Sequence, residues 1–164
     1  MQFMTERFGM IEIDPSEIFE FPLGIIGFPE YHRYGLHHDE KLAPFMWLQS
    51  LEEPRLCFFI VEPFLIFSNY EIEVKLDDIL EQDLGDMRDL LVLTICTIAA
   101  DFRASTANLV APLIITKERR IGYQVVLEDE RYATRHRLFD PVGEPDSLLE
   151  ANESSETVSR ISQA

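Results

Sequence analysis

The chain has 164 residues, of which 30 are acidic and 14 are basic, and its formal net charge is −16. A chain of this length usually folds as one domain with a sizeable core, and twelve Phe, five Tyr and one Trp supply large apolar side chains for it. Because so negative a surface repels phosphate groups, the composition argues against direct binding of nucleic acids or anionic membranes. A basic partner is the natural complement.

The two cysteines and the amino-terminal residues indicate where the protein works. Cys57 and Cys96 lie within apolar runs, where a free thiol behaves as a small hydrophobic group. Residues 1–9 mix polar and charged residues with apolar ones, so they lack the continuous apolar segment of a signal peptide. We therefore expect a cytoplasmic protein.

Alternating or continuous apolar segments between Pro and Gly turns predict about eight strands. The expected strands are 10–13, 18–21, 45–51, 56–61, 70–76, 90–100, 109–116 and 121–127, with the last two forming a hairpin. One short helix is expected over Asp78–Leu84, capped by Asp77 and ended by Gly85. The sequence thus predicts an all-β fold, a small antiparallel sandwich or barrel-like domain over residues 1–139.

The composition changes after Phe139. Residues 140–164 contain six acids and one base, with few large apolar groups. Such a segment buries too little apolar surface to order itself. We expect a flexible acidic carboxy-terminal tail.

The most apolar stretch of the chain, 90–116, contains a polar insert. The apolar runs 90–100 and 109–116 flank residues 101–108, Asp-Phe-Arg-Ala-Ser-Thr-Ala-Asn. We interpret them as two central strands joined by a loop that displays side chains. Pro112 cannot donate a ladder hydrogen bond, which indicates an edge or a bulge in the second strand.

Catalytic and metal-binding patterns are weak. Ser105 or Thr106 could be combined with His136 and Asp101 as in a hydrolase, but no Gly-x-Ser-x-Gly turn presents the serine, and the insert is equally consistent with a capped turn. The other candidate cluster is polar and contains His32, His37 and His38. Adjacent histidines point to opposite sides of a strand and no further ligand completes a set, so we expect a surface loop over 31–41. The sequence predicts neither an enzyme nor a metal or cofactor site.

Two other segments leave alternatives open. Residues 23–29 combine two Gly and one Pro with Leu, Ile and Phe, which predicts a tight loop whose apolar side chains pack inward. The aromatic run 64–70 belongs either to the core, which we favour, or to an exposed interaction surface. A barrel whose aromatic side chains line a ligand-binding lumen is the alternative function.

Three motifs resemble those of one family. They are Phe21-Pro-Leu-Gly-Ile-Ile-Gly-Phe28, the segment Phe45-Met-Trp-Leu-Gln-Ser50 with Pro54 and Pro63-Phe64, and Ser105-Thr-Ala-Asn-Leu-Val-Ala-Pro-Leu-Ile-Ile115. In this order, over residues 8–139, the chain is similar to the bacterial flagellar assembly factor FliW family.

The resemblance implies a small, mostly β, barrel-like protein without enzymatic activity. It also implies two partners, flagellin and the RNA-binding translational regulator CsrA. In this family, CsrA bound by FliW no longer represses flagellin translation, and surplus flagellin titrates FliW away. Candidate partner-binding residues, taken from the aromatic run and the polar insert, are Phe64, Phe67, Tyr70, Asp101, Ser105 and Asn108.

Overall fold

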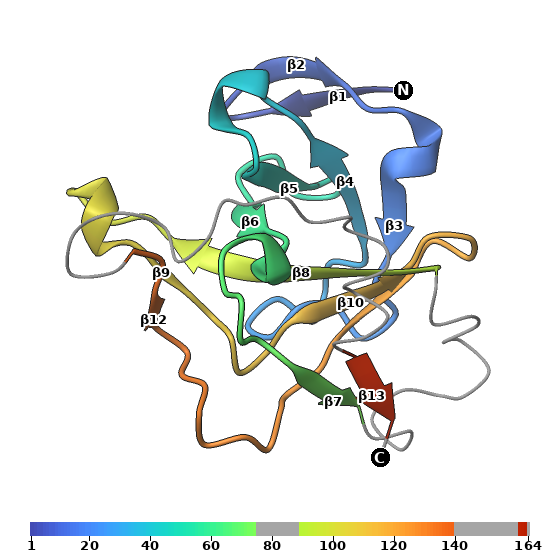
Figure 1. Cartoon of the computed structure of the whole chain (residues 1–164). Coiled ribbons are helices and arrows are strands. Elements are labelled where there is room, and N and C mark those ends of the chain that lie inside the picture. The colour runs from blue at the N-terminus through green and yellow to red at the C-terminus, as the bar shows by residue number, and fades with distance from the viewer. Residues whose placement is uncertain (75–88, 140–160, 164) are drawn as a thin grey trace.

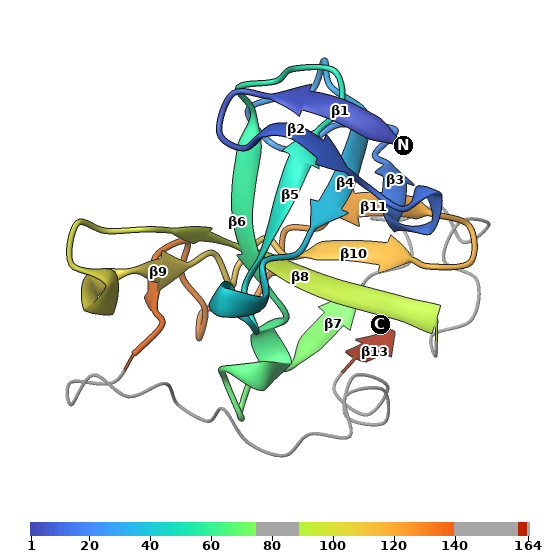
Figure 2. The ribbon, with the colours of Figure 1, turned by 90° about the horizontal axis from the view of Figure 1, so that it is seen from above.

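The computed structural model describes residues 1–74, 89–139 and 161–163. Its centre is a closed ring of strands in the order β10-β11-β3-β4-β5-β6-β8, in which β8 pairs back onto β10 (Figures 1 and 2). The ring consists of β3 (Ile18–Glu20), β4 (Arg33–His37), β5 (Met46–Ser50), β6 (Cys57–Val61), β8 (Leu90–Thr97), β10 (Leu113–Thr116) and β11 (Ile121–Gln124).

This arrangement confirms the all-β, barrel-like class and corrects one detail of it. Directions around a closed ring with an odd number of strands cannot alternate throughout, so at least one pair must be parallel. That pair is β11–β3, where Ile121 lies beside Glu20, and the other neighbours in the ring are antiparallel. The barrel is therefore mixed rather than wholly antiparallel.

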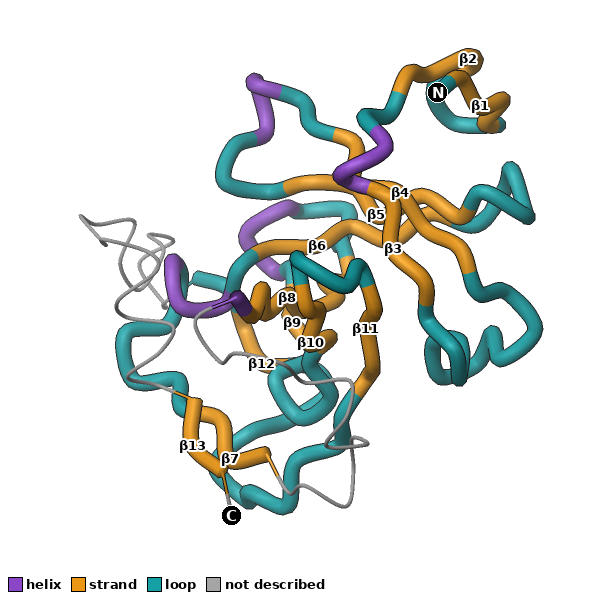
Figure 3. Tube along the Cα trace, turned by 90° about the vertical axis from the view of Figure 1, so that its right-hand side faces the viewer, coloured by secondary structure: helices purple, strands orange, loops and turns teal. Residues whose placement is uncertain are grey.

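Four further strand pairings extend beyond the closed ring. β1 (Gln2–Thr5) and β2 (Gly9–Glu12) form a hairpin. Beyond β8, the sheet continues through β9 (Thr106–Ala107) to β12 (His136–Arg137). β7 (Ile72–Val74) pairs in parallel with β13 (Ile161–Gln163), and the two strands lie apart from the barrel wall (Figure 3).

Helical structure in the described residues is limited to short 3-10 turns. They are η1 (Pro15–Glu17), η2 (Glu40–Leu42), η3 (Pro63–Leu65) and η6 (Phe102–Ala104). No helix in this part of the chain is long and apolar enough to span a bilayer.

Alternation along the strands builds two apolar cores, one on each side of the wall. On β8, Leu91 and Leu93 belong to the inner cluster, whereas Leu90 and Val92 face the outer one. The inner cluster fills the barrel with Phe19, Phe21, Ile25, Tyr34, Leu36, Leu48, Leu56, Ile60, Leu91, Leu93, Leu113 and Ile115. A lumen filled in this way argues against the alternative of a ligand-holding barrel.

Each predicted strand up to 61 and from 90 overlaps a strand of the structure. The strand predicted over 70–76 overlaps β7, which the structure describes over Ile72–Val74. The hairpin of β10 and β11 is confirmed, with Pro112 placed just before β10. The expected surface loop over 31–41 was wrong, because it contains β4, with Tyr34 and Leu36 in the core. Strands β1, β9, β12 and β13 were not predicted either, and β9 lies in the insert that was expected to be a loop.

Two expectations concern residues outside the described part of the chain. The helix expected over 78–84 lies there, and so does the expected tail apart from residues 161–163 of β13. Both stay predictions.

Candidate partner-binding surfaces

The polar insert of the sequence forms the connection from β8 through η6 to β9. The carboxylate of Asp101 accepts a hydrogen bond from the Arg103 N–H (3.1 Å), which caps η6. The hydroxyl oxygen of Ser105 accepts from the Ala99 N–H (3.0 Å), and Ser105 is fully buried. Asn108 accepts at Oδ1 from the Ala111 N–H (3.1 Å). These predicted site residues therefore shape their own turns, and their contact with a partner stays a prediction.

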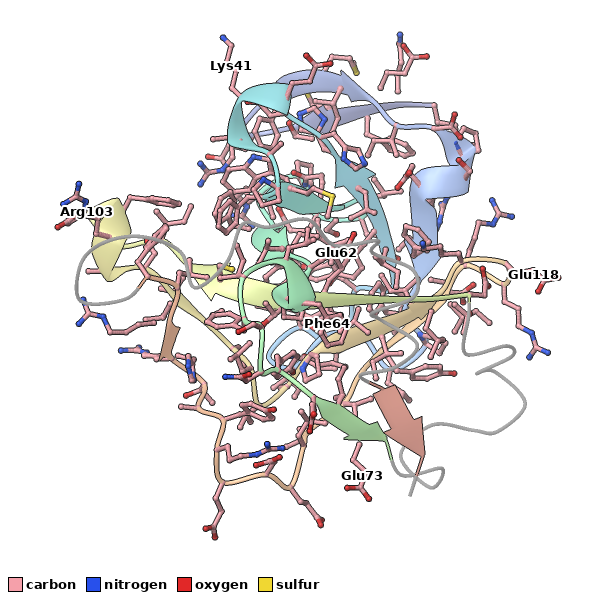
Figure 4. All side chains as sticks on the ribbon, in the orientation of Figure 1. Lys41, Glu62, Phe64, Glu73, Arg103 and Glu118 are labelled. Carbon is pink, nitrogen blue, oxygen red and sulfur yellow. The ribbon has the colours of Figure 1, made fainter. Side chains whose placement is uncertain are left out.

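Residues 101–104 of this connection are exposed, and Phe102 and Arg103 are its largest exposed side chains. Phe102 is 42% exposed and lies edge-on to Phe45, with 5.9 Å between ring centroids. Arg103 projects at the far end of the connection in Figure 4. The sequence analysis selected neither residue, although both stand in the insert that it identified.

The aromatic run belongs to the core, as favoured. Phe64, Phe67 and Tyr70 are all buried in the outer cluster. Tyr70 donates a hydrogen bond from its phenol to the Leu109 carbonyl, and Phe67 packs edge-on against the ring of His136. With these rings buried, a contribution to partner binding would come from the shape of the loop that they support.

The residues considered for catalysis are engaged in structural contacts. The hydroxyl oxygen of Ser105 accepts from the Ala99 N–H, and the ring of His136 packs on Phe67. These contacts differ from the hydrogen-bonded serine–histidine pair of a hydrolase. Burial raises the pKa of the Cys57 thiol to about 11 and that of the Cys96 thiol to about 12, which disfavours the reactive thiolate.

The histidines of the 31–41 segment are also separated by their contacts. The ring of His32 lies 3.0 Å from the Phe21 carbonyl oxygen, and that of His37 packs against Phe8. His38 instead lies 3.7 Å from the Glu17 carboxylate. Within the described residues, no group of three His, Cys, Asp or Glu side chains could hold a metal ion.

The loop 21–29 presents apolar side chains to solvent. Ile25 is buried, but Leu23 is 74% exposed and Ile26 is 62% exposed. The expectation that the apolar side chains of this loop pack inward was therefore wrong for two of them. The glycines and proline of the sequence identified the loop but did not indicate which of its side chains face solvent.

A shallow acidic pocket lies between β7 and the segment after β11. It has a volume of about 250 Å³ and is lined by Glu71, Glu73, Leu127, Glu128 and Asp129. Glu73 points away from the barrel in Figure 4. The hydrogen bonds of the Arg131 side chain and backbone lower the pKa of Asp129, and the closest of these contacts, Nη2 to Oδ2, is 2.7 Å. Arg131 also lies 4.0 Å from the Glu71 carboxylate, so this one cation partly offsets the charge of the four carboxylates that line the pocket.

The described part of the chain is thus a barrel filled with side chains, with apolar and acidic side chains exposed at its surface. Comparison with known proteins identifies the family to which the chain belongs. The family model described as FliW protein matches residues 2–138. The chain belongs to the FliW family of flagellar assembly factors, which are not enzymes.

Individual relatives support this assignment over most of the chain. The flagellar assembly factor FliW of Moorella thermoacetica is 40% identical over 140 residues, which cover 85% of this chain and 89% of that protein. The corresponding protein of a Geobacillus species is 41% identical and covers 85% of this chain and 96% of its own length. A crystal structure of the flagellar assembly factor FliW superposes with a TM-score of 0.76 at 39% identity, over 85% of this chain and 98% of that one.

Proposed function

We propose that this protein acts in the cytoplasm by binding flagellin and the translational regulator CsrA. While it holds CsrA, CsrA does not repress translation of flagellin mRNA, and surplus flagellin withdraws the protein and restores repression. Family membership and the net charge of −16 support this proposal. The observation that carries the CsrA part is the acidic pocket, which suits a basic RNA-binding partner.

The charge provides a physical mechanism for opposing RNA binding. An acidic protein seated beside a basic RNA site adds negative potential there, which repels phosphate groups without occupying the site. Exposed charges are screened beyond ~8 Å at physiological ionic strength, so this repulsion weakens as salt rises. Apolar contacts between the two proteins depend less on salt.

The first experiment is a pull-down from bacterial lysate with the full chain as bait. Co-purification of flagellin and CsrA is the expected result, and the absence of both would contradict the proposal. Adding purified flagellin to the isolated complex with CsrA should then release CsrA.

The second experiment measures the affinity of CsrA for RNA with and without this protein. It is carried out at two salt concentrations at which the protein–protein complex stays intact. The intrinsic salt dependence of RNA binding is taken from the samples without this protein. We expect the inhibition factor, the ratio of the CsrA–RNA affinities without and with this protein, to shrink at the higher salt. An unchanged factor would contradict repulsion and indicate steric block or a conformational change in CsrA.

A further inference from the structure

We propose that Leu23, Ile26 and Val126 form an apolar docking face for a basic protein segment that carries apolar side chains. The three side chains are 74%, 62% and 55% exposed. The inference rests on the proposed function, because it assigns a binding surface to the basic partner.

The loop that presents Leu23 and Ile26 is fixed by its backbone. Gly24 has a φ of +67°, and a Cβ atom there would lie 2.6 Å from the Cα atom of Pro29. Gly24 donates to the Phe21 carbonyl (2.9 Å), and Phe28 donates to the Ile25 carbonyl (2.7 Å). The buried side chain of Ile25 anchors the middle of the loop. Leu23 and Ile26 are thus held in solvent by a preorganised turn, which lowers the entropy cost of binding.

A side chain of β11 joins this loop to Val126. Gln124 accepts at Oε1 from the Ile26 N–H (2.8 Å) and donates from Nε2 to the Ala111 carbonyl (3.1 Å). After β11 the chain remains extended, since the N–H groups of Val125 and Leu127 donate to the carbonyls of Pro112 and Val110. Val125 and Leu127 point into the outer core, so Gln124 and Val126 share the opposite face of this segment.

The chain then runs into the acidic pocket. Glu128, exposed like Val126, follows it roughly 7 Å further along an extended chain. It lines the pocket together with Glu71, Glu73, Leu127 and Asp129. An apolar surface that borders several carboxylates complements a segment with apolar and basic side chains side by side.

The charge also decides between a partner and a second copy of this chain. Two copies meeting through this face would bring together two proteins that each carry a net charge of −16. Like charges brought face to face oppose association, whereas Lys or Arg side chains would be attracted. A basic segment is therefore the occupant that we propose.

The test compares two double variants of the full chain. In Leu23→Ser/Ile26→Ser, the docking face loses two exposed side chains. The matched control is Met4→Ser/Met10→Ser, which removes a cross-strand pair that is 59% and 57% exposed on the β1–β2 hairpin. Thermal melts of all variants check that the substitutions leave the fold intact.

Binding is measured by calorimetry with CsrA and, separately, with a synthetic amphipathic peptide of Leu and Lys. We expect Leu23→Ser/Ile26→Ser to weaken both interactions about tenfold or more, and the Met4/Met10 control to leave them unchanged. Glu73→Gln/Glu128→Gln should weaken binding chiefly at low salt, compared with Glu40→Gln/Glu118→Gln as the charge-matched control. A Leu and Glu peptide should not bind.

The outcomes separate this inference from the proposed function. In one outcome, CsrA fails to bind the wild-type chain while the Leu and Lys peptide binds it and binds Leu23→Ser/Ile26→Ser more weakly. That result supports the docking face and contradicts the proposed binding of CsrA. If CsrA binds every variant equally and the peptide does too, the function stands and the docking face is overturned. A dimer of the wild-type chain in light scattering that Leu23→Ser/Ile26→Ser abolishes would assign the face to a second copy and also overturn the proposal.

Discussion

The phenol of Tyr70 donates a hydrogen bond of 2.8 Å to the carbonyl oxygen of Leu109, which lies 39 residues further along the chain. Both residues are buried in the outer core. The bond ties the segment between η3 and β7 to the stretch that connects β9 with β10. Burial raises the pKa of the phenol, so it remains a donor at physiological pH.

Tyr70→Phe should lower the free energy of unfolding by about 1–3 kcal/mol, because the carbonyl of Leu109 would lose this partner in the core. Urea denaturation at pH 7 measures the change. Tyr132→Phe is the control: its hydroxyl oxygen accepts from the Glu71 N–H in an exposed setting, so a smaller loss is expected. Equal losses of unfolding free energy in the two variants would show that burial does not strengthen the contribution of the Tyr70 hydrogen bond.

Gly24→Ala should destabilise the protein by more than Gly9→Ala. Both glycines have positive φ, so each substitution costs about 1–2 kcal/mol in backbone strain. A Cβ at Gly24 would also overlap the backbone of Phe28 and Pro29, whereas one at Gly9 meets no atom within 4 Å. Thermal unfolding of the two variants tests this order, and a smaller shift for Gly24→Ala would show that the loop relaxes freely.

Gly122→Ala should crowd the inside of the barrel wall. The added Cβ would lie 2.6 Å from the ring atoms Cε1 and Cζ of Phe21, which predicts a loss of about 1–3 kcal/mol. Phe21→Leu in the same chain provides room, so the double variant should be more stable than the sum of the single effects predicts. Unfolding free energies from urea denaturation complete this double-mutant cycle. Additive effects would mean that the added Cβ does not crowd the ring of Phe21.

Cys57 and Cys96 should react slowly with a thiol reagent at pH 8 in the native protein. Burial raises their pKa values to about 11 and about 12 from an ordinary value of 9.0. The thiolate population falls about tenfold for each unit by which the pKa exceeds its ordinary value. Colorimetric titration in buffer and in urea compares the two states. Rapid modification in buffer would contradict burial of the thiols.

Glu52 should make stability depend on pH below its ordinary pKa of 4.5. Partial burial raises the pKa of Glu52, but hydrogen bonds from the Arg33 and His32 N–H groups lower it overall. A lowered pKa in the folded state stabilises the protein above pH 4.5, and this stabilisation is lost as the pH falls through the folded-state pKa. Glu52→Gln should therefore flatten the decline in unfolding free energy between pH 5 and pH 3, unlike the exposed control Glu12→Gln.

Strand prediction succeeded where the local pattern matched the three-dimensional environment. The run 90–97 was recognisable because both faces of β8 are buried, one in each core. β4 was missed because the three histidines of 31–41 favoured a polar loop, although Tyr34 and Leu36 alternate around Gly35. Gly35 explains part of this pattern, since a Cβ there would lie 2.5 Å from Cδ1 of Ile13. That requirement arises from a distant segment and leaves no local signal.

The candidate site was less predictable than the fold. Charge indicated a basic partner, and the motif Phe21–Phe28 was recognised, but its exposed side chains were expected to face inward. Whether Leu23 points to solvent depends on the backbone turn at Gly24 and on Gln124, which is far away in sequence. Likewise, Phe67 packs on His136 and Tyr70 bonds to Leu109, and a local pattern cannot predict contacts so distant in sequence.

The parallel pair β11–β3 has a consequence for synthesis. It joins Glu20 to Ile121, roughly one hundred residues apart, so the barrel cannot close until most of the chain has left the ribosome. Until then the outer edge of β3 has no neighbour, and an open edge can pair with other chains. Pairings so distant in sequence also form slowly. Nascent chains of this protein therefore pass through an aggregation-prone interval that ends only when β11 emerges.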